Sequence, residues 1–368
     1  MSDRSPNSEL GGLIVPNTVQ SMRALALTAT QNLEILALPR PEARPGTVVV
    51  RVAYCGICGS DLARFFGGTV RAFPLVLGHE ISGTVADVGD GVVGVSPGMK
   101  VSVAPLVPCG ICALCKAGRP ALCSNYSFLG SREQGGLAEY INVPAENLAV
   151  LPDVVSLQHA ALVEPLTIAI HGIDRAQVYD HDTVAVFGAG VIGLLTIFAL
   201  RRRRTGRIIA VDTQPQKLEL ARVFGADEVV LAEDDSVHSF FSTQPAPTIC
   251  IETAGSPVTR VQAVEYCARG GQVVFVGTSQ RDVTFSPEIF EKVLRGELRI
   301  TGSWMSYSSP FPGKEWEEAV HLVASGAFDA GKLIDGIYDF GDLAQPFLDL
   351  KDARGSLLKL LYRVDGAA

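Results

Sequence analysis

One short turn decides how the second half of this chain folds: Phe187-Gly188-Ala189-Gly190-Val191-Ile192-Gly193. It joins an apolar run that predicts a strand to an apolar run that predicts a helix. In such a G-x-G-x-x-G turn the first glycine permits the tight bend, the second lets the backbone approach a pyrophosphate, and the third lets helix and strand pack closely. The helix N-terminus then offers unpaired N–H groups to the phosphates. Alone, this motif is weak evidence for dinucleotide binding.

An acidic residue at the end of the next predicted strand strengthens the interpretation. The run 208–211 ends in Asp212, twenty-two residues after Gly190, where a carboxylate accepts the hydroxyls of a ribose. The same carboxylate would repel the extra phosphate of NADP, and Thr213 and Gln214 supply no compensating cation. The sequence therefore predicts NAD as the cofactor. The predicted contacts are Gly188, Gly190, Val191, Ile192, Gly193, Asp212, Val276 and Thr278.

Beyond this turn, strand-like and helix-like segments alternate. The predicted strands lie near 184–187, 208–211, 228–231, 248–251, 272–276 and 298–301. The predicted helices lie near 191–204, 214–224, 257–268 and 287–295. This pattern is typical of an α/β domain with a six-stranded, doubly wound parallel sheet, the Rossmann fold.

The apolar run from Thr183 to Leu200 imitates a membrane span, because Arg201–Arg204 follows it like a basic stop signal. Three clustered glycines divide the run into a short strand and a helix, so we do not expect a membrane segment. The arginines then lie at the C-terminal end of that helix, where cations suit its dipole. We expect a solvated helix end, with nucleotide or nucleic-acid contact as a minor alternative.

From Met22 to about Val150, short β-branched runs broken by Gly and Pro predict a compact, mostly β domain. Its most distinctive stretches are Tyr54-Cys55-Gly56-Ile57-Cys58-Gly59-Ser60-Asp61 and Gly78-His79-Glu80. Thiolate, imidazole and carboxylate are the usual zinc ligands, and a catalytic zinc takes three of them and keeps one position open. The alternative is a reactive or buried cysteine near an unrelated histidine.

Four further cysteines, Cys109, Cys112, Cys115 and Cys123, lie within one local loop. Four thiolates surround a tetrahedral zinc and leave no open position, so this spacing predicts a structural zinc site. Two disulfides or an iron–sulfur cluster are the alternatives. The signal is stronger than that of the first motif alone.

A zinc with an open position beside an NAD site indicates alcohol oxidation. The third zinc ligand has two candidates. Glu80 directly follows His79, whereas Glu164 stands in a strongly apolar stretch, where an unpaired carboxylate would be costly.

The residues that follow Cys58 have predicted roles in the same reaction. Ser60 is placed to accept the proton of the alcohol, although a structural Ser60 that caps the following helical turn is an alternative. We expect Asp61 to orient the imidazole of His79 through a hydrogen bond. Cys55 is expected to pack within the preceding strand.

Length and charge limit the remaining possibilities. The chain has 368 residues, which suits two domains, and its net charge of −8 argues against a general nucleic-acid or anionic-membrane surface. No secretion signal is evident at the N-terminus, so we expect a cytoplasmic protein. Residues 1–21, rich in Ser, Asn, Gly and Pro, are expected to form a loose extension.

Taken together, these motifs resemble the zinc-dependent medium-chain dehydrogenases along nearly the whole chain from Met22. The resemblance implies Cys58, His79 and Glu164 as catalytic zinc ligands, with Glu80 close by, and a Glu rather than a Cys at the third position is similar to the polyol-dehydrogenase branch. It also implies a homodimer or homotetramer. The implied domains are a GroES-like catalytic domain of residues 22–166 and 305–368 and a Rossmann domain of residues 167–304.

Two narrower stretches resemble the bacterial galactitol-1-phosphate 5-dehydrogenases: 127–136, with Ser131-Arg132, and 302–317. They imply oxidation of a sugar-alcohol phosphate. In that group a second arginine follows, whereas this chain has Glu133, and a carboxylate there weakens the phosphate assignment. Free polyols, amino-cyclitols and aminoglycoside sugars therefore stay open as substrates. A zinc- and NAD-binding protein without turnover is the alternative from another functional class.

Overall fold

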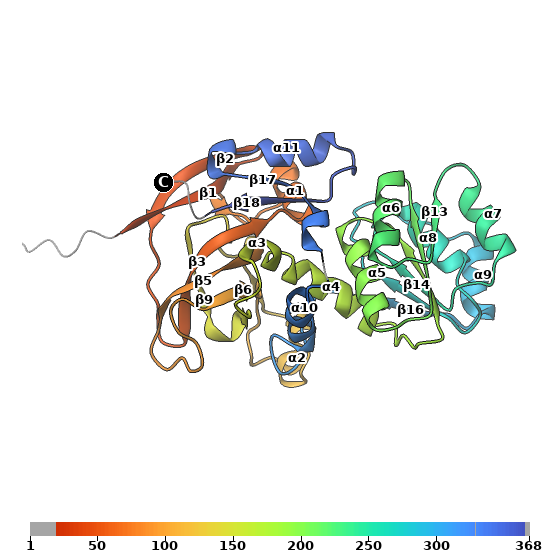
Figure 1. Cartoon of the computed structure of the whole chain (residues 1–368), viewed down its shortest axis with the longest axis horizontal. Helices are drawn as coiled ribbons and strands as arrows, with labels where there is room; N and C mark the ends of the chain where they lie inside the picture. The colour runs from red at the N-terminus through yellow and green to blue at the C-terminus, as the bar shows by residue number, and fades with distance from the viewer. Residues whose placement is uncertain (1–19, 328, 365–368) are drawn as a thin grey trace, which may run out of the picture.

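A computed structural model of the chain describes residues 20–327 and 329–364. These residues form a mostly β body and an α/β body side by side (Figure 1). Of the predicted N-terminal extension, residues 1–19 lie outside the described ranges, whereas Ser21 already begins the first strand.

The mostly β body combines the N-terminal part of the chain with its C-terminal end. Its strands are β1 (Ser21–Ala29), β2 (Asn32–Pro39), β3 (Thr47–Gly56), β4 (Leu75–Val76), β5 (Glu80–Val88), β6 (Lys100–Val103), β7 (Leu106–Val107), β8 (Ser127–Phe128), β9 (Tyr140–Pro144), β10 (Leu148–Val150), β17 (Ile334–Tyr338) and β18 (Lys359–Arg363). Its helices are α1 (Gly59–Gly67), α2 (Ala113–Lys116), α3 (Leu157–Ala160) and α11 (Gln345–Asp352), with the 3₁₀ turns η1 (Pro120–Leu122), η2 (Ala145–Asn147), η3 (Ala330–Leu333) and η4 (Phe340–Asp342).

One sheet of this body organises the rest. Its strand order is β10-β6-β5-β3-β18-β17, and β9 also pairs with β3. β3 is central because four of its valines are fully buried, as expected of β-branched residues in a strand covered on both sides. The C-terminal strand β18 pairs with β3 although some 300 residues separate them in sequence. A smaller sheet has the order β2-β1-β4, and β7 pairs with β8.

The α/β body contains one parallel sheet with the strand order β13-β12-β11-β14-β15-β16. This confirms the predicted doubly wound fold, including the number of strands. The strands are β11 (Thr183–Phe187), β12 (Arg207–Asp212), β13 (Glu228–Leu231), β14 (Ile249–Glu252), β15 (Gln272–Phe275) and β16 (Arg299–Gly302). The helices are α5 (Val191–Arg202), α6 (Pro215–Phe224), α7 (Ser236–Thr243), α8 (Pro257–Glu265) and α9 (Pro287–Arg295).

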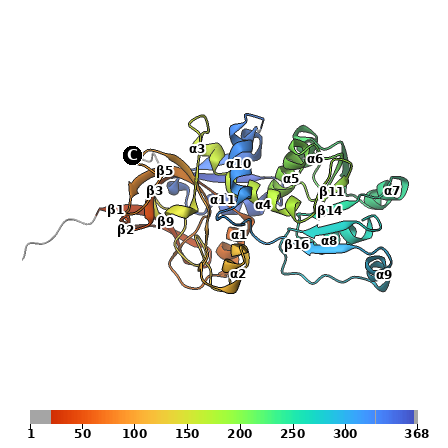
Figure 2. The same cartoon turned by 90° about the horizontal axis from the view of Figure 1, so that it is seen from below.

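Two helices lie between the bodies, α4 (Val163–Asp174) and α10 (Lys314–Ala324), as both views show (Figures 1 and 2). They pack on each other and α4 packs on α5, so one apolar cluster continues from the parallel sheet into the junction. The stretch 165–174 lies within α4 and is helical. The domain boundaries at 166 and 304 stay a prediction.

The apolar run 183–200 is divided as the sequence predicted, into β11 and the buried helix α5. Across the described ranges, no helix combines the length and the apolar character that a bilayer crossing requires.

Candidate active site

The pairing of β3 with β5 brings the two predicted zinc motifs together. Gly56 lies opposite Glu80 in the register, so Cys58, two residues beyond Gly56, meets His79, which directly precedes β5. The ligand atoms of Cys58, His79 and Glu80 all lie within 4.8 Å of one another. A thiol, an imidazole and a carboxylate form a donor set that suits zinc, and His79 and Glu80 are buried.

Asp61 lies beside the imidazole of His79, the group that the sequence predicted it to orient. The carboxylate is 1% exposed, and its Oδ1 lies 3.5 Å from His79 Nδ1. Its Oδ2 accepts a 3.1 Å hydrogen bond from the backbone N–H of Cys58. Burial alone would disfavour the imidazolium, but the charge of Asp61 outweighs it and raises the pKa of His79 well above its ordinary value. Within the described residues Nδ1 makes no well-aligned hydrogen bond, so the orienting hydrogen bond to Asp61 stays a prediction.

Glu80 has a partner that the sequence analysis missed. Nζ of Lys359 donates to both carboxylate oxygens, at 2.6 and 2.7 Å, and to the carbonyl of Ile57 at 2.9 Å. Burial disfavours the ammonium, yet the negative charge of Glu80 raises the pKa of Lys359. A lysine within the apolar run 357–362 was the available signal, because a buried lysine needs a charged partner.

Glu164 lies close to this group but outside it. It occupies the first turn of α4 and is 6% exposed. Burial raises the pKa of its carboxyl to about 7, and the charge of Glu80 adds to this while the charge of His79 opposes it. Of the two candidates for the third ligand, the structure therefore brings Glu80 into the three-residue group and keeps Glu164 as a buried neighbour.

Ser60 is the second residue of α1, and the N-cap position belongs to Cys58. Ser60 therefore does not cap this helix, which removes the structural alternative considered for it. Its side chain is exposed at the edge of the site. Cys55 is fully buried in β3, as predicted.

The four clustered cysteines converge as predicted for a metal lobe. The thiols of Cys109, Cys112, Cys115 and Cys123 all lie within 4.8 Å of one another. Backbone N–H groups of Cys109 and Cys115 point at the sulfurs of Cys123 and Cys112, at 3.3 and 3.5 Å. Hydrogen bonds from the backbone at Cys115 and Ser124 lower the pKa of Cys112 to about 5, which favours the thiolate that a metal requires. All eight cysteines of the chain, each within the described ranges, are free thiols.

The predicted nucleotide site lies at the carboxyl edge of the parallel sheet, where β11 meets β12 and β14. Gly188 has φ +102°, and a Cβ on Gly193 would lie 1.8 Å from the carbonyl oxygen of Gly188, so both positions require glycine. A Cβ on Gly190 would meet no atom within 4 Å, which leaves the open space that a pyrophosphate would fill.

Asp212 is joined to that turn. Its Oδ2 accepts a 2.6 Å hydrogen bond from the N–H of Ala189, and its Oδ1 accepts one of 2.9 Å from Gln214. A carboxylate has about four acceptor sites, so two remain for ribose hydroxyls. Val276 and Thr278 follow β15 at the same edge, and the backbone of Thr278 closely approaches Gly255 of the loop after β14. The residues present fit a dinucleotide.

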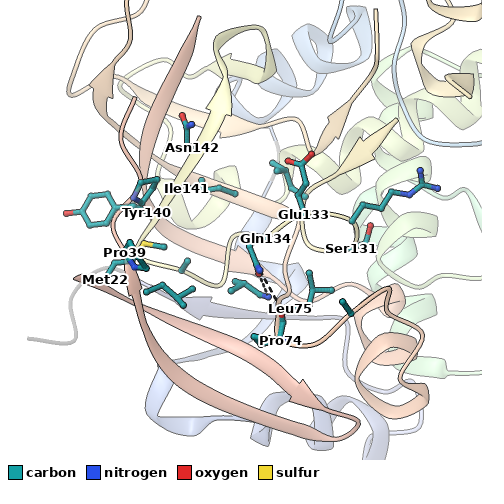
Figure 3. Close-up of a pocket in the computed structure, with 18 of the residues that line it drawn as sticks. Met22, Pro39, Pro74, Leu75, Ser131, Glu133, Gln134, Tyr140, Ile141 and Asn142 are labelled. Carbon is teal, nitrogen blue, oxygen red and sulfur yellow. Dashed lines mark hydrogen bonds between the residues drawn. The ribbon is translucent and has the colours of Figure 1, made fainter. Parts of the chain in front are cut away.

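A separate cavity of about 650 Å³ lies on the mostly β body (Figure 3). Its lining is mainly apolar and includes Met22, Leu75 and Tyr140, with Ser131 and Glu133 at one end. It contains none of the predicted zinc or NAD residues. Arg132 is fixed at its margin, because the guanidinium stacks 3.6 Å from the centre of the Tyr126 ring and donates to the Tyr126 carbonyl at 2.7 Å.

Comparison with known proteins agrees with this geometry. Residues 44–153 match the alcohol dehydrogenase GroES-like domain, and residues 191–325 match the zinc-binding dehydrogenase domain. The chain is 38% identical over 306 residues to galactitol 1-phosphate 5-dehydrogenase of Escherichia coli K12, covering 82% of this chain and 88% of that one. It is 34% identical over 330 residues to a probable D-xylulose reductase A of Aspergillus clavatus, with 86% and 90% covered.

Solved structures show the same fold. The crystal structure of galactitol-1-phosphate dehydrogenase from Escherichia coli matches with a TM-score of 0.88 and 35% identity over 93% of this chain and all of that one. An alcohol dehydrogenase of Escherichia coli CFT073 complexed with NADH matches with a TM-score of 0.86, 29% identity, and 93% and 99% covered. A zinc-binding dehydrogenase of Sinorhizobium meliloti bound to NADP matches with a TM-score of 0.82, 30% identity, and 94% and 99% covered. The chain therefore belongs to the zinc-dependent medium-chain dehydrogenase family, in its polyol dehydrogenase branch.

Proposed function

We propose that this enzyme oxidises a secondary alcohol of a polyol or polyol phosphate to a ketone, with NAD as the hydride acceptor. The observation that carries the proposal is the convergence of Cys58, His79 and Glu80 where β3 ends and β5 begins. When bound, zinc would polarise the alcohol oxygen, as it lowers the pKa of a bound water from about 15.7 to about 7, and NAD would accept the hydride.

The chain itself supplies ligands, orientation and a path for the proton. We assign Cys58 and His79 as catalytic zinc ligands. Glu164 is assigned as the third ligand although Glu80 lies closer to the pair, because Lys359 already holds both carboxylate oxygens of Glu80. Cys109, Cys112, Cys115 and Cys123 are assigned as ligands of a structural zinc. Glu80 remains a direct ligand only if it leaves Lys359, which holds both of its oxygens. The carbinol C–H bond breaks with its electron pair leaving as hydride, and the hydroxyl proton passes to Ser60 and then to solvent.

NAD is proposed over NADP because of Asp212. Its carboxylate lies at the end of β12, bonded to the glycine-rich turn, where a 2′-phosphate would meet its negative charge. Family members of known structure hold NADH in one case and NADP in another, so the choice rests on this residue.

The substrate class rests on the relatives, which are named for galactitol 1-phosphate and for D-xylulose. These names favour a polyol over an amino-cyclitol or an aminoglycoside sugar. A phosphorylated polyol is supported by Arg132, which Tyr126 holds rigid, and is opposed by the neighbouring carboxylate of Glu133. The relatives are dehydrogenases and reductases, which argues against a protein without turnover.

We further propose a homodimer or homotetramer in the cytoplasm. β16 is the edge strand of the parallel sheet, and Ile300 within it is 42% exposed, so two copies could pair there and continue the sheet. Eight free thiols suit a reducing compartment.

The test measures NADH absorbance with purified enzyme against galactitol 1-phosphate, galactitol, sorbitol, xylitol and an amino-cyclitol, before and after chelation of zinc. We expect the polyols or their phosphates to be oxidised only by the zinc-loaded enzyme. Activity that survives complete zinc removal would exclude the zinc mechanism. Faster reduction of NADP than of NAD would exclude the role given to Asp212.

A further inference from the structure

Arg64, in the last turn of α1, touches two residues of the proposed active site at once. Its Nη1 donates to Ser60 Oγ at 2.9 Å and to Asp61 Oδ1 at 3.0 Å. The three residues share one face of the helix, because Ser60 and Asp61 precede Arg64 by four and three positions. None of the zinc or nucleotide motifs includes Arg64.

The contact with Asp61 reaches the metal ligands. The Oδ1 that accepts from Arg64 is the oxygen that faces His79 Nδ1 at 3.5 Å. The other oxygen of Asp61 holds the backbone of Cys58. One cation therefore restrains the carboxylate that holds the backbone of Cys58 and faces the imidazole of His79.

The burial of the Arg64–Asp61 pair distinguishes it from an ordinary salt bridge on a helix surface. The side chain of Asp61 is 1% exposed and that of Arg64 is 17% exposed. An exposed pair at this spacing contributes little, whereas a buried carboxylate that loses its cation is left with an uncompensated charge. Arg64 thus supplies the counter-charge of a buried carboxylate and holds it in place.

The contact with Ser60 constrains the proposed proton path. A hydroxyl oxygen accepts two hydrogen bonds and donates one. With one acceptor site taken by Arg64, Ser60 keeps one acceptor site for the alcohol proton and its own proton to pass on.

We propose that Arg64 is a positioning residue for the dehydrogenase reaction, holding Ser60 in its proton-accepting rotamer and Asp61 against His79. This inference rests on the proposed function. It assigns Arg64 no contact with the substrate.

The test compares Arg64→Met and Arg64→Lys with the wild type as zinc-loaded enzymes. Galactitol 1-phosphate and NAD serve as substrates, and zinc release to excess EDTA is followed by zinc analysis of the desalted protein. Loss of a residue that orients metal ligands typically costs 10- to 100-fold. For Arg64→Met we expect kcat to fall by about 10- to 100-fold, KM for the alcohol to change less than about threefold, and zinc to leave about 10-fold faster. Arg64→Lys keeps the positive charge but cannot contact Ser60 and Asp61 at the same time. Its kcat and its rate of zinc release should lie between those of the wild type and Arg64→Met.

Arg222→Met is the matched control. Arg222 forms an i,i+3 pair with Glu219 on α6, and both side chains are well exposed. We expect wild-type kcat and zinc release from it.

Wild-type kcat and wild-type zinc release in Arg64→Met would overturn the inference. A rise in KM alone would also overturn it, because Arg64 would then bind substrate and not position Ser60. If the wild type oxidises no alcohol, the proposed function fails, and the zinc-release rates still decide the role of Arg64. If Arg64→Met does not fold, Arg64→Lys decides: an unchanged kcat and zinc release overturn the inference, and a partial loss of both supports it.

Discussion

At the level of single residues, the buried pair of Lys359 and Glu80 allows a quantitative prediction of how much one substitution lowers the free energy of unfolding. Lys359→Met leaves the Glu80 carboxylate buried without its counter-charge, which typically costs about 3–5 kcal/mol. We expect a loss of that size in the free energy of unfolding, measured in urea on the zinc-loaded protein. Adding Glu80→Gln to this variant removes the unpaired charge and should recover part of the loss.

The control for this prediction is Lys332→Met. Lys332 pairs with Asp329 where both side chains are largely exposed, so its loss should cost less than about 1 kcal/mol. If Lys359→Met and Lys332→Met lowered the free energy of unfolding equally, the buried pair would stabilise the protein no more than the exposed pair does.

A second residue-level prediction concerns Asp212. Asp212→Ala removes the proposed ribose acceptor and the charge that repels a 2′-phosphate, so KM for NAD should rise about 10-fold and the preference for NAD over NADP should narrow. Initial rates with both cofactors measure this. Glu233→Ala, an exposed change just after β13, is the control. An unchanged cofactor preference would count against the assignment.

Some residues of the site were predictable and others were not, for a physical reason. Cys58, His79 and the glycines of 188–193 stand in short motifs, so residue type and spacing were enough to make them candidates. The partnership of Lys359 with Glu80 spans 279 positions and depends on the pairing of β18 with β3, which no local pattern encodes. Arg64 was missed because a helix arginine is usually solvated.

At the level of elements, the junction helix α10 holds a buried acid whose pH dependence can be tested. Oε1 of Glu315 lies 2.8 Å from His171 Nδ1 on α4, and Ser308 donates to Oε2 at 2.6 Å. Burial would raise the pKa of Glu315, but these hydrogen bonds outweigh it and lower the pKa below its ordinary value. A lowered pKa means that the folded state favours the ionised form. The stabilisation is therefore complete above the unfolded pKa, about 4.3, and is lost as pH falls through the folded value.

The variant Glu315→Gln should accordingly be less stable than the wild type by about 1–3 kcal/mol at pH 7. The difference should shrink as pH falls below about 4.3, measured by urea unfolding at a series of pH values. Glu317→Gln, an exposed change on the same helix, should alter the free energy of unfolding by less than about 0.5 kcal/mol. A Glu315→Gln difference that grows toward acid would contradict the sign of this linkage.

Elements with strong periodicity were predicted to within a few residues, and the errors have identifiable causes. The helix α7 was missed because Ser236–Thr243 is short and poor in strong helix formers. The arginines after α5 were expected in solvent. Arg203 instead bridges Asp174 of α4 and Glu318 of α10, at 2.6 Å to each, because tertiary packing brings the C-terminal ends of α4 and α5 against the middle of α10.

At the level of the whole molecule, the two proposed zinc sites should be separable. They draw on different segments: one joins the end of β3 to the start of β5, whereas the other lies within a single loop around α2. We expect about two zinc ions per chain in the wild type and about one in either Cys58→Ser or Cys112→Ser, by elemental analysis. Cys267→Ser, which changes a buried thiol remote from both groups, should keep about two.

The functional consequences of the two losses should differ. A structural zinc contributes directly to folding, so Cys112→Ser should lower the unfolding temperature. Cys58→Ser should keep a near wild-type unfolding temperature, because the four-cysteine site remains intact in this variant. It should lose hydride transfer, because no zinc remains to polarise the alcohol oxygen. If Cys58→Ser kept two zinc ions and full activity, the metal would be held elsewhere. If Cys112→Ser bound two zinc ions with unchanged stability, the four-cysteine loop would not be a metal lobe, and its tight spacing would need another explanation.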